Sequence, residues 1–290
     1  MRRVSANAYA EIYFWGCNPG FLVTSEGVVL FDTPQQPNDA VRWREQALAH
    51  GPIRYLINTE PHNDHIRGNA YFPGVEVIGQ SGLRPRYEKA IPQMTGPELL
   101  ETMKQTDPDS VWLYNHPGYP PNPPTRLFDE ELTLQLGKHT LHCLHLPGHT
   151  APQTAIHIPE ENVVFTGDNI FSRCKTFIQE ADPWEWLAAL ERIAALDVEV
   201  IVPGHGEPVD RSYCAEQAQI IRDWVGAVES MVQRGLTEEE ALQQPAPAAD
   251  PYAPGQRLFA MNDRINAMNV SNIYRHIVER QKAALLDRRA

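Results

Sequence analysis

Short apolar runs separated by polar turns make up the first third of the chain. Their β-branched and aromatic side chains, bounded by Gly, Pro, Asn and Ser, predict strands. The expected strands span 10–15, 20–24, 28–31, 53–58 and 75–79. Between the third and the fourth, apolar residues at helical spacing predict a helix over 38–50, with Asn38 as its N-cap. This stretch therefore predicts strands interleaved with helix, as in layered α/β proteins.

The pattern changes at residues 80–125, which prolines interrupt repeatedly. We expect a surface-wrapping insertion near the functional site here, with a short helix at 97–103. Strands are predicted again at 132–136, 140–146, 154–158, 163–166 and 198–202. Helices are predicted at 184–196, 212–233, 237–243 and 258–286, the third opened by a capping box of Thr237 and Glu240. The chain is therefore expected to form one α/β domain over 1–290, with a C-terminal helical extension over 211–290.

Composition narrows the class of protein. The 290 residues carry 37 Asp and Glu against 25 Lys and Arg, a formal net charge of −12. An acidic chain lacks the positive surface of a general nucleic-acid binder. No apolar run approaches the roughly 20 residues of a membrane span, and Glu11 makes the first residues a poor signal peptide. The four cysteines are scattered, which predicts reduced thiols and a cytoplasmic location.

Potential metal ligands gather directly after predicted strands. The segment Thr59-Glu60-Pro61-His62-Asn63-Asp64-His65 follows one strand, and His149, Asp168 and His205 each follow another, preceded in every case by glycine. A lone histidine after a strand is usually structural. Four such segments, each at a strand end, instead predict a metal site. Imidazole and carboxylate together suit Zn²⁺, Mn²⁺ or Fe.

This combination resembles the metallo-β-lactamase-fold metallohydrolases. Their pattern of H-x-H-x-D-H, then G-H, then Asp, then G-H-G corresponds here to Glu60–His65, Gly148-His149, Gly167-Asp168 and Gly204-His205-Gly206. The early strand that ends in Asp32 and the position of Asn18 also match, and the resemblance covers about residues 12–206. It implies a four-layer αββα sandwich with the metals at one edge of the two sheets.

The resemblance also implies roles for individual residues. The implied ligand sets for two divalent cations are Glu60, His62 and His149 for one, Asp64, His65 and His205 for the other, and Asp168 as the bridge between them. Asp32 would orient a ligand loop, unless it simply ends a strand. Zinc is the expected metal. Because the family has a histidine where this chain has Glu60, Mn or Fe stays open.

Glu60 is the sharpest departure from the family pattern, and three interpretations compete. It is a carboxylate ligand, or it misses the metal and acts through a water or as a proton shuttle, or it is structural and leaves a site for one metal. The first interpretation is preferred. Since every other ligand position of the pattern is filled, an inactive enzyme is not expected.

The predicted function is a metal-dependent hydrolase acting on a small ester, lactone, thioester or amide, with Asp64 and Asp168 in catalytic roles. An iron-dependent oxidoreductase, a lyase or a dehalogenase on the same scaffold is the alternative, and a β-lactamase or a non-catalytic binding protein is less favoured. Trp184 and Trp112 are weaker candidates for contacts with a small-molecule substrate. Association with a second copy through the C-terminal helices stays open.

Overall fold

The computed structural model describes residues 1–245, 247–252 and 261–287. These residues form two compact units. The first unit comprises Met1–Leu146, Pro152–Ile170 and Asp197–Arg211, and the second comprises Pro147–Ala151, Phe171–Leu196 and Ser212–Ala290. Both units contain residues from distant parts of the sequence, so each is described by itself below.

A seven-stranded sheet, in the order β1 to β7, forms one layer of the first unit. Its strands are β1 (Arg2–Arg3), β2 (Ala8–Ala10), β3 (Gly20–Thr24), β4 (Gly27–Phe31), β5 (Ile53–Ile57), β6 (Glu76–Gln80) and β7 (Arg126–Phe128). Pairing is antiparallel from β1 to β4 and parallel from β4 to β7. The strand expected at 10–15 is wrong, because β2 ends at Ala10. The next pair in register is Glu11 and Pro19, where Glu11 N–H donates to Pro19 O but proline has no N–H to return the bond.

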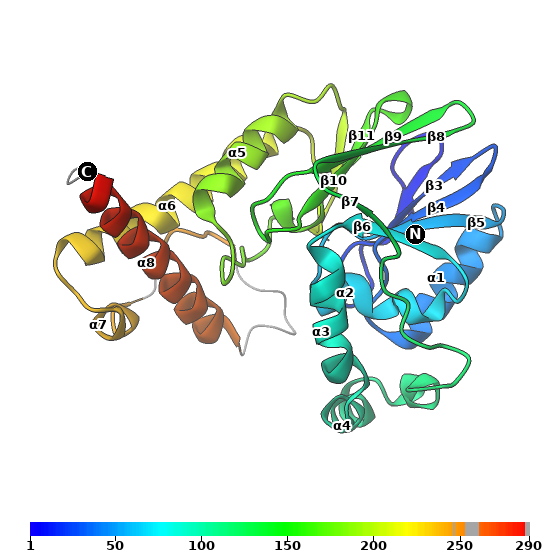
Figure 1. Ribbon diagram of the computed structural model, residues 1–290, viewed down its shortest axis with the longest axis horizontal. Helices are drawn as coiled ribbons and strands as arrows, with labels where there is room; N and C mark the ends of the chain where they lie inside the picture. Colours follow the sequence, from blue (N-terminus) through cyan, green and yellow to red (C-terminus); the bar gives the residue numbers. More distant parts are fainter. Residues whose placement is uncertain (246, 253–260, 288–290) are drawn as a thin grey trace. The chain divides into compact units, whose positions relative to one another are not determined.

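A five-stranded sheet, in the order β13-β11-β10-β9-β8, forms the second layer (Figure 1). Its strands are β8 (Glu131–Leu136), β9 (His139–His145), β10 (Thr154–Ile158), β11 (Val163–Phe165) and β13 (Val200–Val202). Alternation along each strand decides which side chains enter the core between the sheets. In β4, Val29 and Phe31 face the second sheet, where the ring of Phe31 lies 4.5 Å from that of Phe165.

The opposite face of the first sheet is covered by α1 (Pro37–Leu48). Val28 and Leu30 of β4 point to this side and pack with Trp43, which is fully buried. The helix begins one residue before the predicted start, with Gln36 and not Asn38 at the N-cap. Pro37 explains the difference, because its fixed φ and missing N–H suit the first helical position.

Residues 80–125 contain more helix than their sequence predicts. The structure has α3 (Leu83–Thr95), α4 (Pro97–Thr106) and the 3₁₀ turn η2 (Pro108–Leu113). The proline pattern does not predict α3 because two prolines lie within the helix. Pro85 occupies its first turn, where no N–H is required, and Pro92 lies inside the helix. Buried Leu83 and Tyr87 hold α3 against the rest of the first unit.

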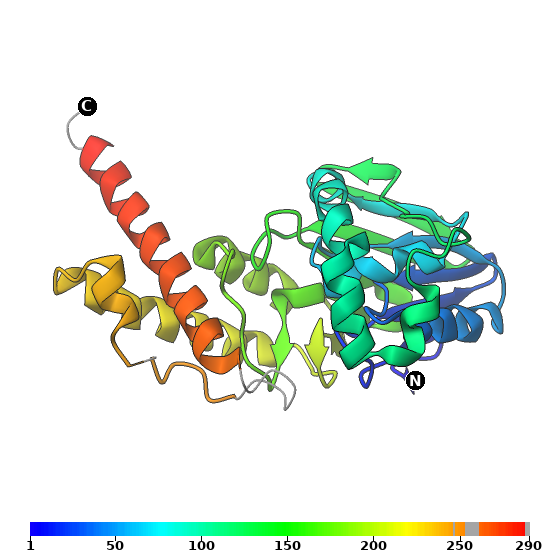
Figure 2. The same cartoon turned by 90° about the horizontal axis from the view of Figure 1, so that it is seen from below.

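The second unit contains β12 (Phe171–Ser172) and four helices among its described residues (Figure 2). These helices are α5 (Pro183–Ala194), α6 (Tyr213–Gln233), α7 (Glu238–Leu242) and α8 (Asn262–Asp287). The capping box of Thr237 and Glu240 is confirmed at the start of α7. The last helix was expected from residue 258, and residues 258–260 lie outside the described part of the chain. No helix in the described residues has the length and apolar character that crossing a bilayer requires.

Candidate metal centre

Four strand ends in the first unit carry predicted ligands or, at Asp32, the residue predicted to orient them. Asp32 follows β4, and Glu60 follows β5 just before the short helix α2 (Asn63–Ile66). Asp168 lies in the 3₁₀ turn η4 (Gly167–Asn169) after β11, and His205 begins β14 (His205–Gly206) after β13. Because β4 and β5 are parallel neighbours, as are β11 and β13, their carboxyl ends present these residues at the same edge of each sheet.

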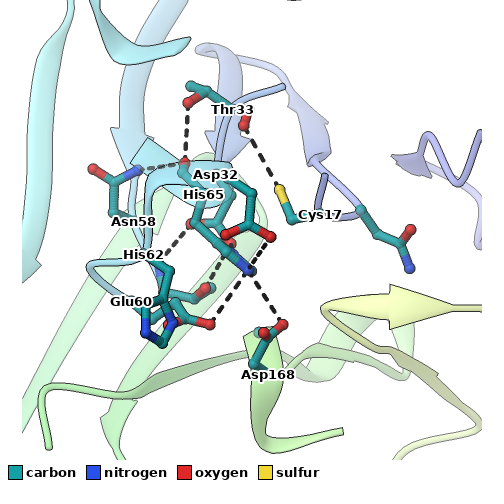
Figure 3. A network of polar contacts seen from close by, with 12 residues as sticks. Cys17, Asp32, Thr33, Asn58, Glu60, His62, His65 and Asp168 are labelled. Carbon is teal, nitrogen blue, oxygen red and sulfur yellow. Dashed lines mark hydrogen bonds and ion pairs between the residues drawn. The ribbon is translucent and has the colours of Figure 1, made fainter. Parts of the chain in front are cut away.

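Asp32 contacts both ends of the ligand segment Thr59–His65 (Figure 3). Its Oδ1 accepts from the Thr59 N–H at 2.7 Å, while its Oδ2 accepts from the Thr59 hydroxyl at 2.5 Å and lies 2.8 Å from His65 Nδ1. The backbone of Asp32 has φ of 52°, in the left-handed region that Asp tolerates better than most residues. A buried carboxylate that accepts from Nδ1–H leaves the Nε2 lone pair of His65 available for a cation.

His65 is fully buried, and its Nε2 faces three carboxylates. The nearest oxygens are Asp168 Oδ1 at 3.2 Å, Glu60 Oε1 at 3.3 Å and Asp64 Oδ2 at 3.8 Å. Burial works to lower the pKa of His65, but the acidic groups around it, first Cys17 and then Glu60, Asp168 and Asp32, hold that pKa well above its ordinary value. One imidazole cannot compensate the buried carboxylates of Glu60 and Asp168 together with the partly exposed one of Asp64, so this arrangement favours additional positive charge.

His205 extends the same cluster. Its Nε2 lies 3.2 Å from Asp64 Oδ2 and 3.3 Å from Asp168 Oδ2. Burial opposes ionisation of Asp168, yet His205 and then His65 hold the pKa of that carboxyl well below its usual range. Ligand atoms of Asp64, His65 and His205 all lie within 4.8 Å of one another. The first unit thus brings one complete predicted ligand set together with Asp168.

Glu60 and His62 form the second part of the centre. Glu60 Oε2 lies 2.5 Å from His62 Nδ1, and ligand atoms of Glu60, His62 and Asp168 lie within 4.8 Å of one another. The Glu60 side chain has no exposed surface. Both of its oxygens face imidazole nitrogens, one from His62 and one from His65. A donor set of carboxylate oxygens and imidazole nitrogens fits divalent cations such as Zn²⁺, Mn²⁺ or Fe²⁺.

Two glycines allow the strand ends to approach so closely. A Cβ on Gly204 would lie 1.8 Å from Asp168 Oδ1, and one on Gly167 would lie 2.4 Å from the Thr59 hydroxyl. Gly167 also has φ of 50°, whereas Gly204 has no positive φ. The sequence predicts a sharp turn at both positions. At Gly204 the reason for glycine is instead the space that the Asp168 carboxylate occupies.

Cys17 and Asn18 hold supporting positions. The ligand atoms of Cys17, Asp32 and His65 lie within 4.8 Å of one another, and burial raises the pKa of the Cys17 thiol to about 12. Asn18 Nδ2 donates to Pro203 O and Gly206 O, on either side of His205. Asn18 already matched the family pattern. Nothing in the spacing of Cys17 pointed to the centre.

His149 belongs to the second unit. Its Nδ1 lies 2.9 Å from Phe177 O, and its ring centroid lies 5.3 Å from that of Phe171 and 5.4 Å from that of Trp186. A backbone carbonyl can only accept, so Nδ1 carries the proton and Nε2 keeps its lone pair. This is the tautomer that a metal ligand bonding through Nε2 requires.

The two candidate substrate-binding tryptophans lie in different settings. In the second unit, the guanidinium carbon of Arg280 lies 4.1 Å from the centroid of the Trp184 ring, and His276 is its other ring neighbour. Trp112 lies in η2 of the first unit with 66% of its surface exposed. Their contacts with substrate stay predictions.

Comparison with known proteins agrees with the geometry. The family model of the metallo-beta-lactamase superfamily matches residues 12–205. The linear primary-alkylsulfatase of a Pseudomonas species is 22% identical over 76% of this chain, which spans 48% of that enzyme. The hydroxyacylglutathione hydrolase of Erythrobacter litoralis is 25% identical over 71% of this chain and 67% of that enzyme. The chain thus spans only about half the length of the alkylsulfatase.

Solved structures show the same fold. A metallo-beta-lactamase family protein from Thermus thermophilus superimposes with a TM-score of 0.66 and 17% identity, covering 97% of this chain and 96% of that one. The predicted α/β sandwich is therefore confirmed as the metallo-beta-lactamase fold. Since the family model covers most of the chain and includes both ends of the ligand pattern, the chain belongs to the metallo-beta-lactamase superfamily.

Proposed function

We propose that this chain is a metal-dependent hydrolase of small ester or thioester substrates. The observation that carries the proposal is the gathering of Glu60, His62, Asp64, His65, Asp168 and His205 at one edge of the first unit, with carboxylate and imidazole atoms a few ångströms apart. Family membership supports it, as do relatives whose names are those of hydrolases.

The proposed ligand sets follow the family pattern. Asp64, His65 and His205 hold one cation, and Glu60 and His62 hold the other together with His149. Asp168 would bridge them, because its oxygens face His65 and His205 of one set, while ligand atoms of Asp168, Glu60 and His62 also lie within 4.8 Å of one another. Only 4% of Asp168 is exposed, so its carboxylate needs the cations and imidazoles around it to stabilise its negative charge.

Burial favours Glu60 as a direct ligand. A proton shuttle needs contact with solvent or substrate, and the side chain of Glu60 has no exposed surface. Its oxygens face His62 and His65, one from each proposed set. A carboxylate ligand in place of a histidine adds negative charge, which favours harder cations such as Mn²⁺ or Fe²⁺ beside Zn²⁺.

Exposure indicates which side of the first unit's cluster admits substrate. The side chains of His62, Asp64 and His205 are 24%, 25% and 25% exposed, whereas Glu60 and His65 are fully buried. When bound, the cations lower the pKa of a water and polarise the electrophilic centre of an ester. Asp64 is the carboxylate on the open side, so it orients the attacking water and holds the proton that the water gives up.

Two substrate classes are favoured. Carboxylic esters and thioesters come first, and lactones and amides share the carbonyl that such a site attacks. The names of the hydroxyacylglutathione hydrolase and of an acyl-coenzyme A thioesterase from Gallus gallus, 26% identical over 53% of this chain, support the thioester. Sulfate esters are the second candidate, because the structure of an alkylsulfatase from a Pseudomonas species covers 94% of this chain at a TM-score of 0.66.

The test begins with protein purified without added metal. We expect about two equivalents of divalent metal by plasma emission spectrometry, from two ligand sets. The reloaded Zn²⁺, Mn²⁺ and Fe²⁺ forms are then assayed on a carboxylic ester, a lactone, a hydroxyacylglutathione thioester and an alkyl sulfate. One equivalent or less, together with no turnover of any of them by any form, overturns the proposal.

Two variants decide the role of Glu60. Glu60→His restores the family donor and is expected to keep two metals while shifting preference toward Zn²⁺. Glu60→Gln keeps the shape but loses the charge, so it is expected to bind the first metal more weakly. If Glu60→Gln keeps wild-type metal content and affinity but loses activity, Glu60 is a proton shuttle and not a ligand.

A further inference from the structure

Buried asparagines form a stripe on the last helix of the second unit. Asn266, Asn269 and Asn272 follow one another at three-residue spacing in α8 and are 8%, 0% and 6% exposed. That spacing places them on one face of the helix. Asparagine is a poor helix former, and a buried amide must find hydrogen-bond partners. Their presence therefore calls for an explanation other than helix stability.

Asn269 holds the segment that precedes α5. Its Nδ2 donates to Thr176 O at 3.0 Å, and its Oδ1 accepts from the Ile178 N–H at 2.7 Å. The backbone groups fix which amide atom is which, because a carbonyl only accepts and an N–H only donates. Asn269 therefore holds the chain on both sides of Phe177, in the way that a neighbouring strand would.

Phe177 is the residue whose carbonyl accepts from His149. The distance from His149 Nδ1 to Phe177 O is 2.9 Å, and both residues lie in the second unit. Neighbours reinforce the segment: Asn272 Nδ2 donates to Ile178 O at 2.7 Å, and Gln217 Nε2 donates to the Thr176 hydroxyl at 3.2 Å. Among these amides, Asn269 is the one that contacts the residues on both sides of Phe177 through its own two amide atoms.

We propose that Asn269 is a positioning residue for His149: by fixing the Phe177 carbonyl, it selects the Nδ1–H tautomer that leaves Nε2 for a metal. The inference rests on the proposed function, in which His149 is a ligand. It assigns to α8, outside the family match at 12–205, a role in the metal centre. Partners that orient a ligating histidine typically change metal affinity by roughly 10- to 100-fold.

The experiment compares Asn269→Leu with Asn266→Leu. Asn266 is the matched control: it is the same residue type one turn earlier on the same helix, it is also buried, and its Oδ1 has no hydrogen-bond partner among the described residues. Should Asn269→Leu fail to fold, Asn269→Asp replaces it. An aspartate there still accepts from Ile178 N–H but cannot donate to Thr176 O.

Two readouts are used, neither of which is turnover. The first is the ¹⁵N spectrum of histidine-labelled, metal-free protein, which reports the tautomer of the His149 ring. The second is affinity for each metal, by competition with a chelator. We expect Asn269→Leu to mix the two tautomers of His149 and to weaken one metal about tenfold, leaving the other unchanged. Asn266→Leu should match wild type in both.

The outcomes separate this inference from the proposed function. If Asn269→Leu keeps a single Nδ1–H tautomer and wild-type metal affinities, or if Asn266→Leu changes them equally, the positioning role is wrong. His149→Ala tests the ligand assignment itself and should lose one metal. If His149→Ala keeps both metals at wild-type affinity, the assignment of His149 in the proposed function fails, and the positioning role toward a metal fails with it.

Discussion

The two units hold their buried polar segments with different chemistry. In the first unit the central acceptors are carboxylates: Asp32 contacts both ends of the Thr59–His65 segment, and Glu161 accepts from or faces Ser5, Asn7 and His139. In the second unit the buried groups of this kind are neutral amides, those of Asn269, Asn272 and Gln217, while the half-buried carboxylate of Asp250 accepts from Thr176 N–H. Both kinds of group are buried, so the difference is one of charge and not of environment.

The charge of these side chains decides how the stability of each unit depends on pH. An ionised carboxylate only accepts hydrogen bonds, and it binds a proton when the pH falls far enough. A carboxamide donates and accepts at every pH, so it joins a carbonyl and an N–H with one side chain. We therefore expect the first unit to lose stability in acid through Glu161, and the second unit to be insensitive to pH at its amides.

Exchanging the carboxylate of Asp32 for an amide should give the largest effect. In Asp32→Asn, the amide that faces His65 Nδ1 donates where the carboxylate accepted, so Nε2 of that ring takes the proton. We expect a loss of about 3–5 kcal/mol in the free energy of unfolding, as for a buried ion pair deprived of one partner. Affinity for the metal of the His65 set should fall about 100-fold or more.

Urea titration of the metal-free variant and chelator competition measure these two effects. Arg42→Ala is the control, because Arg42 lies 3.6 Å from Asp39 in a surface ion pair of the same unit, and such pairs contribute about 1 kcal/mol or less. Wild-type metal affinity in Asp32→Asn would show that a charged partner of His65 is not needed, and the contrast between the units would lose its functional meaning.

The second largest effect should be a loss of folding stability at low pH, caused by protonation of Glu161. This carboxylate accepts from Ser5 Oγ, from Asn7 N and Nδ2, and lies 2.8 Å from His139 Nε2. Burial works to raise its pKa, but these hydrogen bonds, led by Asn7, lower it to about 2. The depressed pKa gives stability that is present above about pH 4.5 and lost as the pH falls toward 2, about 3 kcal/mol in all.

Urea titrations of wild type and Glu161→Gln at pH 7 and pH 3 isolate that contribution from the other acids. Wild type should lose about 2 kcal/mol more than the variant over this interval, since part of the effect lies below pH 3. Equal losses in both proteins would mean that Glu161 is not the acid-sensitive support of the first unit.

The reverse exchange in the second unit should show the opposite pH dependence. Asn272 Nδ2 donates to Ile178 O at 2.7 Å and to Ala181 O at 2.8 Å. In Asn272→Asp a carboxylate faces two carbonyls, so its folded pKa should rise and the variant should lose about 2 kcal/mol at pH 7.5. Because the folded state then binds the proton more tightly, this penalty should shrink as the pH falls to 5.

The variant Asn272→Leu is the control for that exchange. It removes the same two hydrogen bonds without adding a titrating group, so its penalty should be the same at both pH values. A penalty in Asn272→Asp that is equally constant would indicate that the new carboxylate reaches solvent, and that the amides of the second unit are less enclosed than the structure indicates.

Much of the first unit could be predicted from its sequence, because the pattern within each strand and the residues directly after it are enough to predict the fold and the ligand positions. Alternation within β4 assigns Val29 and Phe31 to one face and Leu30 to the other, and the ligand segments directly follow strands. Glu161 could not be connected to Asn7 in this way, since 154 residues separate them. The helix α3 was missed for a local reason, because its prolines are tolerated by position and by packing.

The buried amides that hold the backbone of the second unit are even harder to predict from the sequence. The Asn269 side chain reaches Ile178 across 91 residues, and the asparagines of α8 follow a helical period without forming a known motif. The tautomer of His149 depends on a carbonyl, which every residue possesses. Sequence could therefore predict the ligand pattern, but the groups that orient His149 emerge only from the folded chain.

The smallest effects on stability are expected for the two tryptophans predicted to contact substrate, one of which lies in each unit. Trp112 of the first unit is 66% exposed, so Trp112→Ala should change the free energy of unfolding by less than about 0.5 kcal/mol. Trp184 of the second unit has Arg280 over its ring. Trp184→Ala should therefore lower the free energy of unfolding by about 0.5–1 kcal/mol more than Trp112→Ala does. If either contacts substrate, its alanine variant should raise KM severalfold with metal content unchanged. An unchanged KM in both would remove these residues from the substrate site and leave Trp184 with a packing role alone.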